Sequence, residues 1–146
     1  MKKFIKSISV LSVILCATMI LFACDGAPKD KRNAPESVVA AAEKMEKAGY
    51  EVEYKEEEFD SEWGLIVGYL SCIIEGEGEE DVSDYIEVAY LFADEASAKA
   101  FYDYNMAERQ ELLDSGLTEE DLMLVVIEGK WGMWASTQKA INDFFA

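Results

Sequence analysis

Histidine is absent from the 146 residues, and only three cysteines and two prolines occur. Without histidine the chain lacks the usual general base, which excludes Ser-His-Asp and Cys-His nucleophile systems and His-containing zinc sites. Cys16 and Cys24 lie near the N-terminus, which leaves Cys72 alone in the rest of the chain. One cysteine forms neither an internal disulfide nor a redox pair. The composition therefore predicts a non-enzymatic protein whose fold depends on its core.

Paired carboxylates, as used by glycosidases, are the remaining catalytic alternative. The 30 Asp and Glu residues make many accidental pairs, and no pair is distinguished by its sequence surroundings. A phosphate-binding glycine loop is also missing, because Glu75-Gly76-Glu77-Gly78 has acids where a phosphate needs hydrogen-bond donors. An enzyme is thus the weakest of the functional hypotheses.

Basic residues are few, with 13 Lys and Arg against 30 Asp and Glu and a net charge of −17. Removing residues 1–23 takes away three lysines and no acid, which leaves 10 bases, 30 acids and a charge of −20. Such a charge repels nucleic acid and anionic lipid and favours cationic partners or divalent ions. We therefore expect no nucleic-acid partner.

An apolar run without charges extends from Ile8 to Phe22 and follows a cluster of three lysines. Its 15 residues fall short of the roughly 20 that a transmembrane helix needs. A basic n-region, an apolar h-region and small residues before a cleavage point are the parts of a secretory signal. Residues 1–23 are therefore predicted to be a signal peptide.

The apolar run ends in Leu21-Phe22-Ala23-Cys24. This ending resembles the lipobox of bacterial lipoproteins, in which a Leu, a tolerant position, a small residue and a Cys direct a dedicated peptidase. The resemblance implies cleavage between Ala23 and Cys24, and a diacylglycerol on the thiol of Cys24. Each CH₂ group buried in the bilayer strengthens membrane binding by about 0.8 kcal/mol. Two or more acyl chains therefore hold a protein firmly on a bilayer. The implied location is the outer face of the cell membrane.

The mature chain is expected to have two parts, a lipidated tether at residues 24–34 and a single domain at 35–146. The tether contains Gly, Pro, Asn and charged residues without apolar periodicity. Lys29, Lys31 and Arg32 lie within it. They either contact anionic headgroups near the anchor or belong to an ordinary solvated linker.

Apolar periodicity predicts three helices and five strands in the domain. One helix is expected at 35–48. A second is expected to be capped by Asp94 and to run to about residue 115, and a third to follow a cap at Ser136 or Thr137. Strands are expected at 50–55, 65–74, 85–92, 122–128 and 131–135. Cys72 lies in the second strand and is expected to be a packed thiol rather than a reactive one.

The expected element order is α-β-β-β-α-β-β-α. Short connections favour an antiparallel sheet of about five strands with helices packed on one face, which is a two-layer α+β fold. The segment from Tyr85 to the C-terminus reads β-α-β-β-α, which is most of a ferredoxin-like unit.

Three tryptophans, Trp63, Trp131 and Trp134, are candidates for contact with a ligand. Because successive strand residues face opposite ways, Trp131 and Trp134 cannot both point into one core from a regular strand. One of them is expected near the surface, where a Trp stacks on a sugar or anchors a partner protein. The alternative is a Trp that simply covers the sheet edge.

No metal site and no cofactor is expected beyond the lipid on Cys24. Acidic clusters at 56–60 and 75–81 offer oxygens to calcium, but neither matches the D-x-[DN]-x-[DN]-G spacing that directs ligands at one point. Solvated loops are the alternative that the composition favours.

The leading functional hypothesis is a non-catalytic lipoprotein that binds a protein, peptide or glycan ligand outside the cell. An accessory subunit of an envelope transporter or cell-wall complex is the alternative. A binding module of this kind is expected to carry an exposed aromatic or apolar patch.

Overall fold

The computed structural model describes residues 32–75 and 83–146. The predicted signal peptide, the Ala23–Cys24 cleavage point and the tether up to residue 31 lie outside these residues. The described elements are α2 (Val38–Lys47), β1 (Glu51–Lys55), β2 (Phe59–Ser61), β3 (Gly64–Ile74), β4 (Asp84–Phe92), α3 (Glu95–Asp114), the 3₁₀ turn η1 (Glu119–Asp121), β5 (Leu124–Glu128), β6 (Trp131–Ala135) and α4 (Gln138–Phe145).

The strands form one antiparallel sheet of six strands in the order β1-β3-β4-β6-β5, with the short β2 also paired to β3. The α+β class with an antiparallel sheet is therefore confirmed. β2 is the strand that the sequence pattern did not predict. Its three residues adjoin the acidic run Glu56-Glu57-Glu58, so they resemble a polar loop, and only pairing with β3 makes them a strand.

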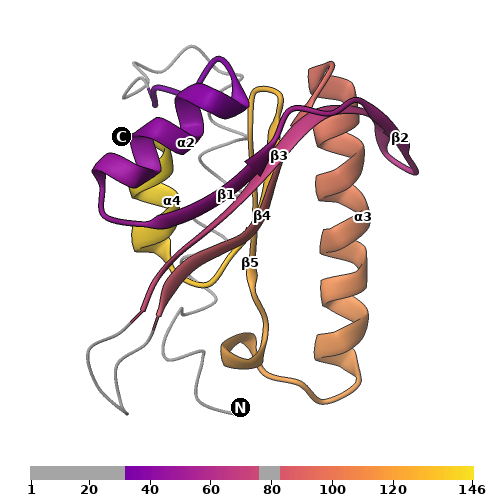
Figure 1. The fold of residues 1–146 in the computed structure, drawn as a ribbon. Helices are drawn as coiled ribbons and strands as arrows, with labels where there is room; N and C mark the ends of the chain where they lie inside the picture. The colour runs from indigo at the N-terminus through magenta and orange to yellow at the C-terminus, as the bar shows by residue number, and fades with distance from the viewer. Residues whose placement is uncertain (1–31, 76–82) are drawn as a thin grey trace.

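The helices cover both faces of the sheet rather than the single face that was expected. Figure 1 shows α2 and α4 side by side on one face and α3 on the other. Two hydrophobic clusters correspond to these faces, one around Phe144 of α4 and one around Phe101 of α3. The fold consequently has three layers, with the sheet in the middle.

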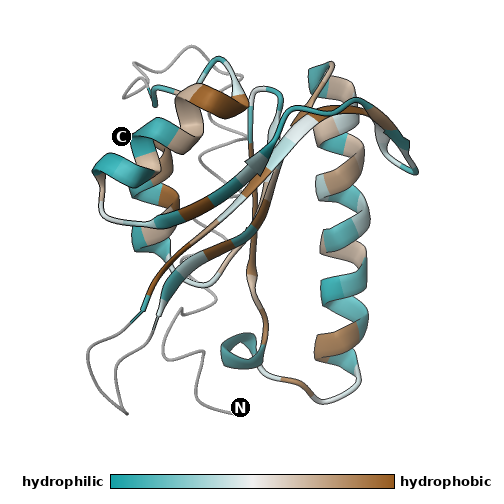
Figure 2. Ribbon diagram, viewed as in Figure 1, coloured by the Kyte–Doolittle hydropathy of each residue, from teal (hydrophilic) through white to brown (hydrophobic). Residues whose placement is uncertain are grey.

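The strands explain this arrangement because their alternate positions are apolar on both sides. In β5, Leu124 and Val126 belong to the α2/α4 face, whereas Val125 and Ile127 belong to the α3 face. Figure 2 shows the resulting hydrophobic residues along the central strands. A strand with two apolar faces needs cover on both.

Two bulges change which face a residue takes. β3 carries an extra residue between Ile66 and Gly68, so Ile66 lies on the α3 face while Leu70 lies on the other, although both positions are even. β4 carries an extra residue between Ile86 and Val88. A bulge inserts one unpaired residue and reverses the alternation beyond it.

The C-terminal half agrees in part with the ferredoxin-like prediction. β6 lies between β4 and β5, as in a split β-α-β unit with α3 as the connection. The similarity ends at α4, which packs on the face opposite α3 (Figure 1).

Helix starts follow the side-chain caps. Asp94 and Thr137 each accept a hydrogen bond from the backbone N–H three residues later, at 2.7 Å and 3.2 Å. The first helix begins at Val38 rather than at Pro35, because Ser37 is its N-cap. Among the residues that the structure describes, no helix has the length and apolar character needed to cross a bilayer.

Candidate functional site

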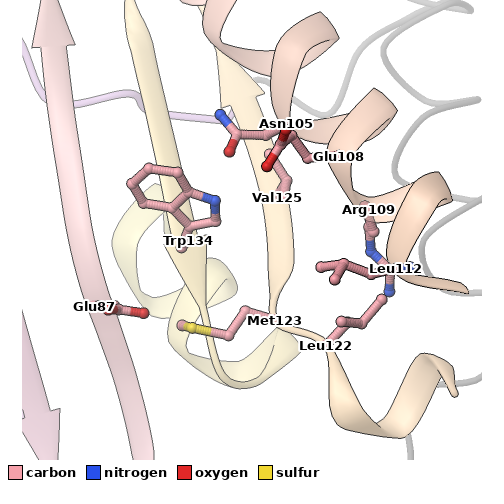
Figure 3. Close-up of a pocket in the computed structure, with 9 residues that line it drawn as sticks. All are labelled: Glu87, Asn105, Glu108, Arg109, Leu112, Leu122, Met123, Val125 and Trp134. Atoms are coloured by element: carbon pink, nitrogen blue, oxygen red, sulfur yellow. The ribbon is translucent and has the colours of Figure 1, made fainter. Parts of the chain in front are cut away.

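A pocket of about 310 Å³ opens on the α3 face of the sheet, between α3 and the ends of β4, β5 and β6 (Figure 3). It lies at the low end of the size range typical of small-molecule sites. Its lining combines acidic, basic, amide, aliphatic and aromatic side chains: Glu87, Asn105, Glu108, Arg109, Leu112, Leu122, Met123, Val125 and Trp134.

The helical side of the pocket comes from one stripe of α3. Glu108 and Arg109 follow Asn105 by three and four residues and precede Leu112 by four and three, so the four residues lie along one face of the helix. Asn105 is fixed by its own helix, since its side-chain nitrogen donates to the Phe101 carbonyl at 2.7 Å. The helix therefore presents these four side chains in a defined order along the pocket.

The sheet side is formed by β4, β5 and β6 together with the segment after η1. Trp134 of β6 and Val125 of β5 are register partners, which places them side by side on the α3 face. Glu87 adjoins the β4 bulge and reaches the pocket from the sheet (Figure 3). The bulge is thus the reason that a carboxylate borders an otherwise apolar strand surface.

Trp134 is held by an aromatic cluster. Its ring lies 4.8 Å from the Phe101 ring, 6.1 Å from Tyr90 and 6.3 Å from Trp63, measured between centroids. These three contacts have T-shaped geometry, which is a favourable arrangement for aromatic rings. The indole is therefore packed on three rings where it borders the pocket.

Arg109 is the buried cation of the pocket, with 5% of its surface exposed. Its Nη2 forms an ion pair with Oε2 of Glu119 in η1. Its Nε–H is buried and has no hydrogen-bond partner among the described residues. An unpaired buried donor of this kind costs free energy.

The three candidate tryptophans have different environments. Trp131 is 1% exposed on the α2/α4 face, and its Nε1 donates to the Pro35 carbonyl at 2.8 Å, so it is a core residue and not a surface anchor. Trp134 lies on the opposite face, as strand alternation predicts, and borders the pocket. Trp63 packs in the same aromatic cluster, and its buried Nε1 has no partner among the described residues.

The other predicted features are partly within the described residues. Ala23 and Cys24 lie outside them, as does most of the acidic cluster at 75–81. Within residues 32–75 and 83–146, no group of three or more Cys, Asp or Glu side chains is arranged to hold a metal. Cys72 is 4% exposed, and burial raises the pKa of its thiol to about 11, in agreement with a packed thiol.

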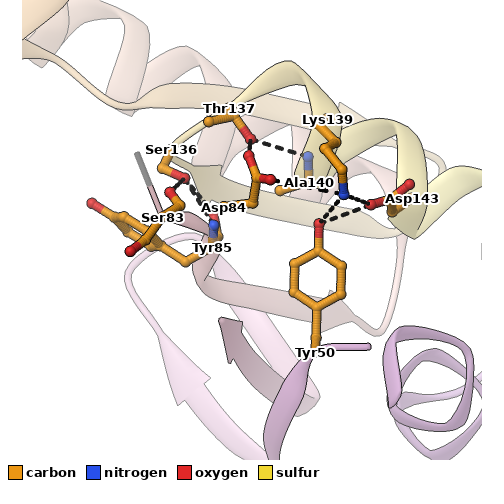
Figure 4. A network of polar contacts seen from close by, with 9 residues as sticks. All are labelled: Tyr50, Ser83, Asp84, Tyr85, Ser136, Thr137, Lys139, Ala140 and Asp143. Atoms are coloured by element: carbon orange, nitrogen blue, oxygen red, sulfur yellow. Dashed lines mark hydrogen bonds and ion pairs between the residues drawn. The ribbon is translucent and has the colours of Figure 1, made fainter. Parts of the chain in front are cut away.

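A second polar cluster joins the start of β4, the residue before β1 and helix α4 (Figure 4). The Tyr50 hydroxyl donates to Asp143 at 2.8 Å, and Lys139 donates to the same carboxylate at 2.7 Å. Thr137 donates to Asp84 at 2.6 Å. Burial raises the pKa of Tyr50, and the Asp143 hydrogen bond raises it further. Each of these groups is paired across elements, so the cluster serves to fasten α4 to the sheet.

Comparisons with protein-family models, with curated proteins and with solved structures gave no match for this chain. The fold and the pocket by themselves define the class as a three-layer α+β domain with an open pocket on the α3 face.

Sequence reasoning found Trp134 but not the rest of the pocket. Arg109 carried one signal that was overlooked, since it is a base among the helix residues Glu108 to Leu113 that otherwise offer acids, Gln and Leu. The role of Glu87 had no sequence signal, because it depends on the β4 bulge. The lining offers carboxylates, an amide, a guanidinium and an aromatic ring, which can supply hydrogen bonds, charge and apolar contact.

Proposed function

We propose that the chain is a lipid-anchored, extracytoplasmic binding protein without catalytic activity. In this proposal acylated Cys24 holds the protein on the outer face of the membrane, and the domain binds a small ligand in the α3 pocket. The observation that carries the binding role is the pocket of about 310 Å³ itself, in which charged side chains of α3 and β4 and an aromatic wall formed by Trp134 border one space. A mainly apolar or aromatic lining with a few polar groups is the usual composition of a ligand site.

The anchoring part rests on the lipobox-like ending Leu21-Phe22-Ala23-Cys24. It is tested by expressing the full chain in a bacterial host and comparing wild type with Cys24→Ser by intact mass and membrane fractionation. We expect the wild type to be membrane-bound and to start at a diacylated Cys24, and the variant to be uncleaved or soluble. Wild-type mass and partitioning in the variant would contradict the anchor.

The binding part is tested by a thermal-shift screen of the detergent-solubilised lipoprotein against amino acids, short peptides, sugars and amines. Leu112→Trp fills the pocket from an exposed position, since Leu112 is 43% exposed. Leu117→Trp is the matched control, because Leu117 is 41% exposed and outside the pocket lining. A compound that stabilises wild type and Leu117→Trp but not Leu112→Trp supports the pocket. If every stabilising compound acts equally on Leu112→Trp, the pocket is not the binding site.

A further inference from the structure

The charges around the pocket are unbalanced. Glu87 and Glu108 both line it, and neither forms an ion pair with a described basic residue. Arg109 is the single base in the lining, and Glu119 already neutralises it. The lining therefore presents two uncompensated carboxylates to whatever enters.

The two carboxylates approach from different elements. Figure 3 shows Glu87 on the β4 side and Glu108 on the α3 side of the pocket. Both residues are exposed, so their charges face the open mouth rather than the core. A positive group that enters the pocket is attracted by both carboxylates without displacing an existing base, because no described basic residue forms an ion pair with either.

The pocket wall suits the same chemistry. The indole of Trp134 borders the pocket, and the face of a Trp ring attracts cations more strongly than any other side-chain ring. Leu112, Leu122, Met123 and Val125 supply apolar surface for the uncharged part of a ligand.

An anion finds no comparable support. Its charge would meet Glu87 and Glu108 at the mouth, and the Arg109 charge is shared with Glu119. The excess of 30 Asp and Glu over 13 Lys and Arg extends this preference over the whole chain, since a negative field concentrates cations at the surface.

We propose that the α3 pocket binds a small organic cation with an apolar body. This inference rests on the proposed binding function and names its ligand class. The ammonium or similar group lies at the mouth that Glu87 and Glu108 border, and the apolar body contacts Trp134.

The test uses calorimetric titration of the full-length, detergent-solubilised lipoprotein with three probes of similar shape. They are L-phenylalaninamide, which is a cation, N-acetyl-L-phenylalaninamide, which is neutral, and N-acetyl-L-phenylalanine, which is an anion. All three keep the phenyl ring and a carbonyl acceptor, so they separate charge from shape. We expect the cation to bind about tenfold or more tightly than the other two, since charge-assisted contacts are roughly twice as strong as neutral ones.

Two double variants separate local from global charge. Glu87→Gln with Glu108→Gln removes the two carboxylates of the pocket. Glu43→Gln with Glu46→Gln removes two exposed carboxylates from α2, on the opposite face of the sheet, and changes the net charge equally. We expect the pocket pair to weaken cation binding about tenfold or more and the α2 pair to change it less than about twofold, because exposed charges beyond the Debye length are largely screened.

The inference is overturned if the cation does not bind, if the neutral or anionic probe binds as well, or if both double variants weaken binding equally. These outcomes can be told apart from failure of the proposed binding function. A sugar or neutral peptide that protects wild type but not Leu112→Trp would keep the pocket as a ligand site and remove only the cation preference.

Discussion

The two faces of the sheet differ in how completely they are packed. On the α2/α4 face, Leu70, Ala89, Met133, Ile141 and Phe144 are all 0% exposed and form one continuous core. On the α3 face, Trp63, Tyr90 and Trp134 stay half-buried, and α3 leaves a pocket beside them. The α2/α4 face is therefore closed, while the α3 face combines a buried cluster around Phe101 with aromatic surface within reach of solvent.

The strand β6 contributes to both faces within four residues. Trp131 is fully enclosed by the α2/α4 core and contacts the Phe144 ring at 5.0 Å, whereas Trp134 borders the pocket. The same residue type thus belongs to the core in one position and borders a pocket in the other. What separates them is the amount of cover that each helix supplies, not the residue itself.

The largest expected effect is a cavity in the closed core. Phe144→Ala should lower the free energy of unfolding by about 3–5 kcal/mol, because a fully buried phenyl ring is lost and its neighbours relax only in part. Leu112→Ala, at the pocket on the other face, removes a side chain that is 43% exposed and should cost less than about 1 kcal/mol. Urea unfolding measures both. Equal losses would mean that the border of the pocket is packed as closely as the α2/α4 core.

A smaller effect is expected where α3 meets β6. A Cβ added at Gly132 would lie 2.6 Å from Cδ1 of Phe101 and 3.1 Å from Cε2 of Phe92, so two buried rings must shift. Gly132→Ala should therefore lower the free energy of unfolding by about 1–3 kcal/mol. Phe101→Leu should recover part of this loss in the double variant, with a coupling of at least about 0.5 kcal/mol. Additive losses in urea unfolding would show that the ring contact does not limit how closely α3 docks.

The smallest expected effect is the pH-dependent contribution of Asp143, which helps to fasten α4 to the sheet. Burial acts to raise the pKa of Asp143, but hydrogen bonds from Lys139 and Tyr50 outweigh it and leave the pKa below its ordinary value of 3.8. A lowered pKa in the folded state means that ionised Asp143 stabilises the fold above pH 3.8 and that this contribution is lost as the pH falls through the folded pKa.

Asp143→Asn should accordingly cost less than about 1 kcal/mol at pH 7, in the range of partly exposed ion pairs. The difference from wild type should shrink below pH 3.8. Urea unfolding at pH 7, 5 and 3 measures how the difference in the free energy of unfolding changes. Adding Lys139→Met to both wild type and Asp143→Asn should reduce the difference between them at pH 7. A difference that is constant across pH would show that the carboxylate charge is not what stabilises α4.

Local patterns were enough to predict most elements. The strand 131–135 and the Asp94 cap were predicted correctly, and the strands around Cys72 and Tyr85 differ from the prediction by a residue at their ends. These features depend on alternation and on a cap three residues from its acceptor, and both are local. The prediction of helices on one face was wrong. Apolar residues at both odd and even positions of a strand indicate that both faces of the sheet are buried, and each face therefore needs its own helices.

The pocket required information that no local pattern contains. Glu87 lies at a bulge in β4, Arg109 lies on one face of the 20-residue helix α3, and Met123 lies in the segment after η1. Their sequence separations range from 14 to 36 residues, so only the packing of α3 on the sheet brings them together.

The sequence by itself determined that the chain is strongly acidic and lacks histidine, that residues 21–24 resemble a lipobox, and that helices and strands follow an α+β order. Only the tertiary structure decided which tryptophan belongs to the core and which borders a pocket. The physical reason is that alternation places Trp131 and Trp134 on opposite faces, whereas the completeness of packing by α4 and α3 determines how far each face is closed.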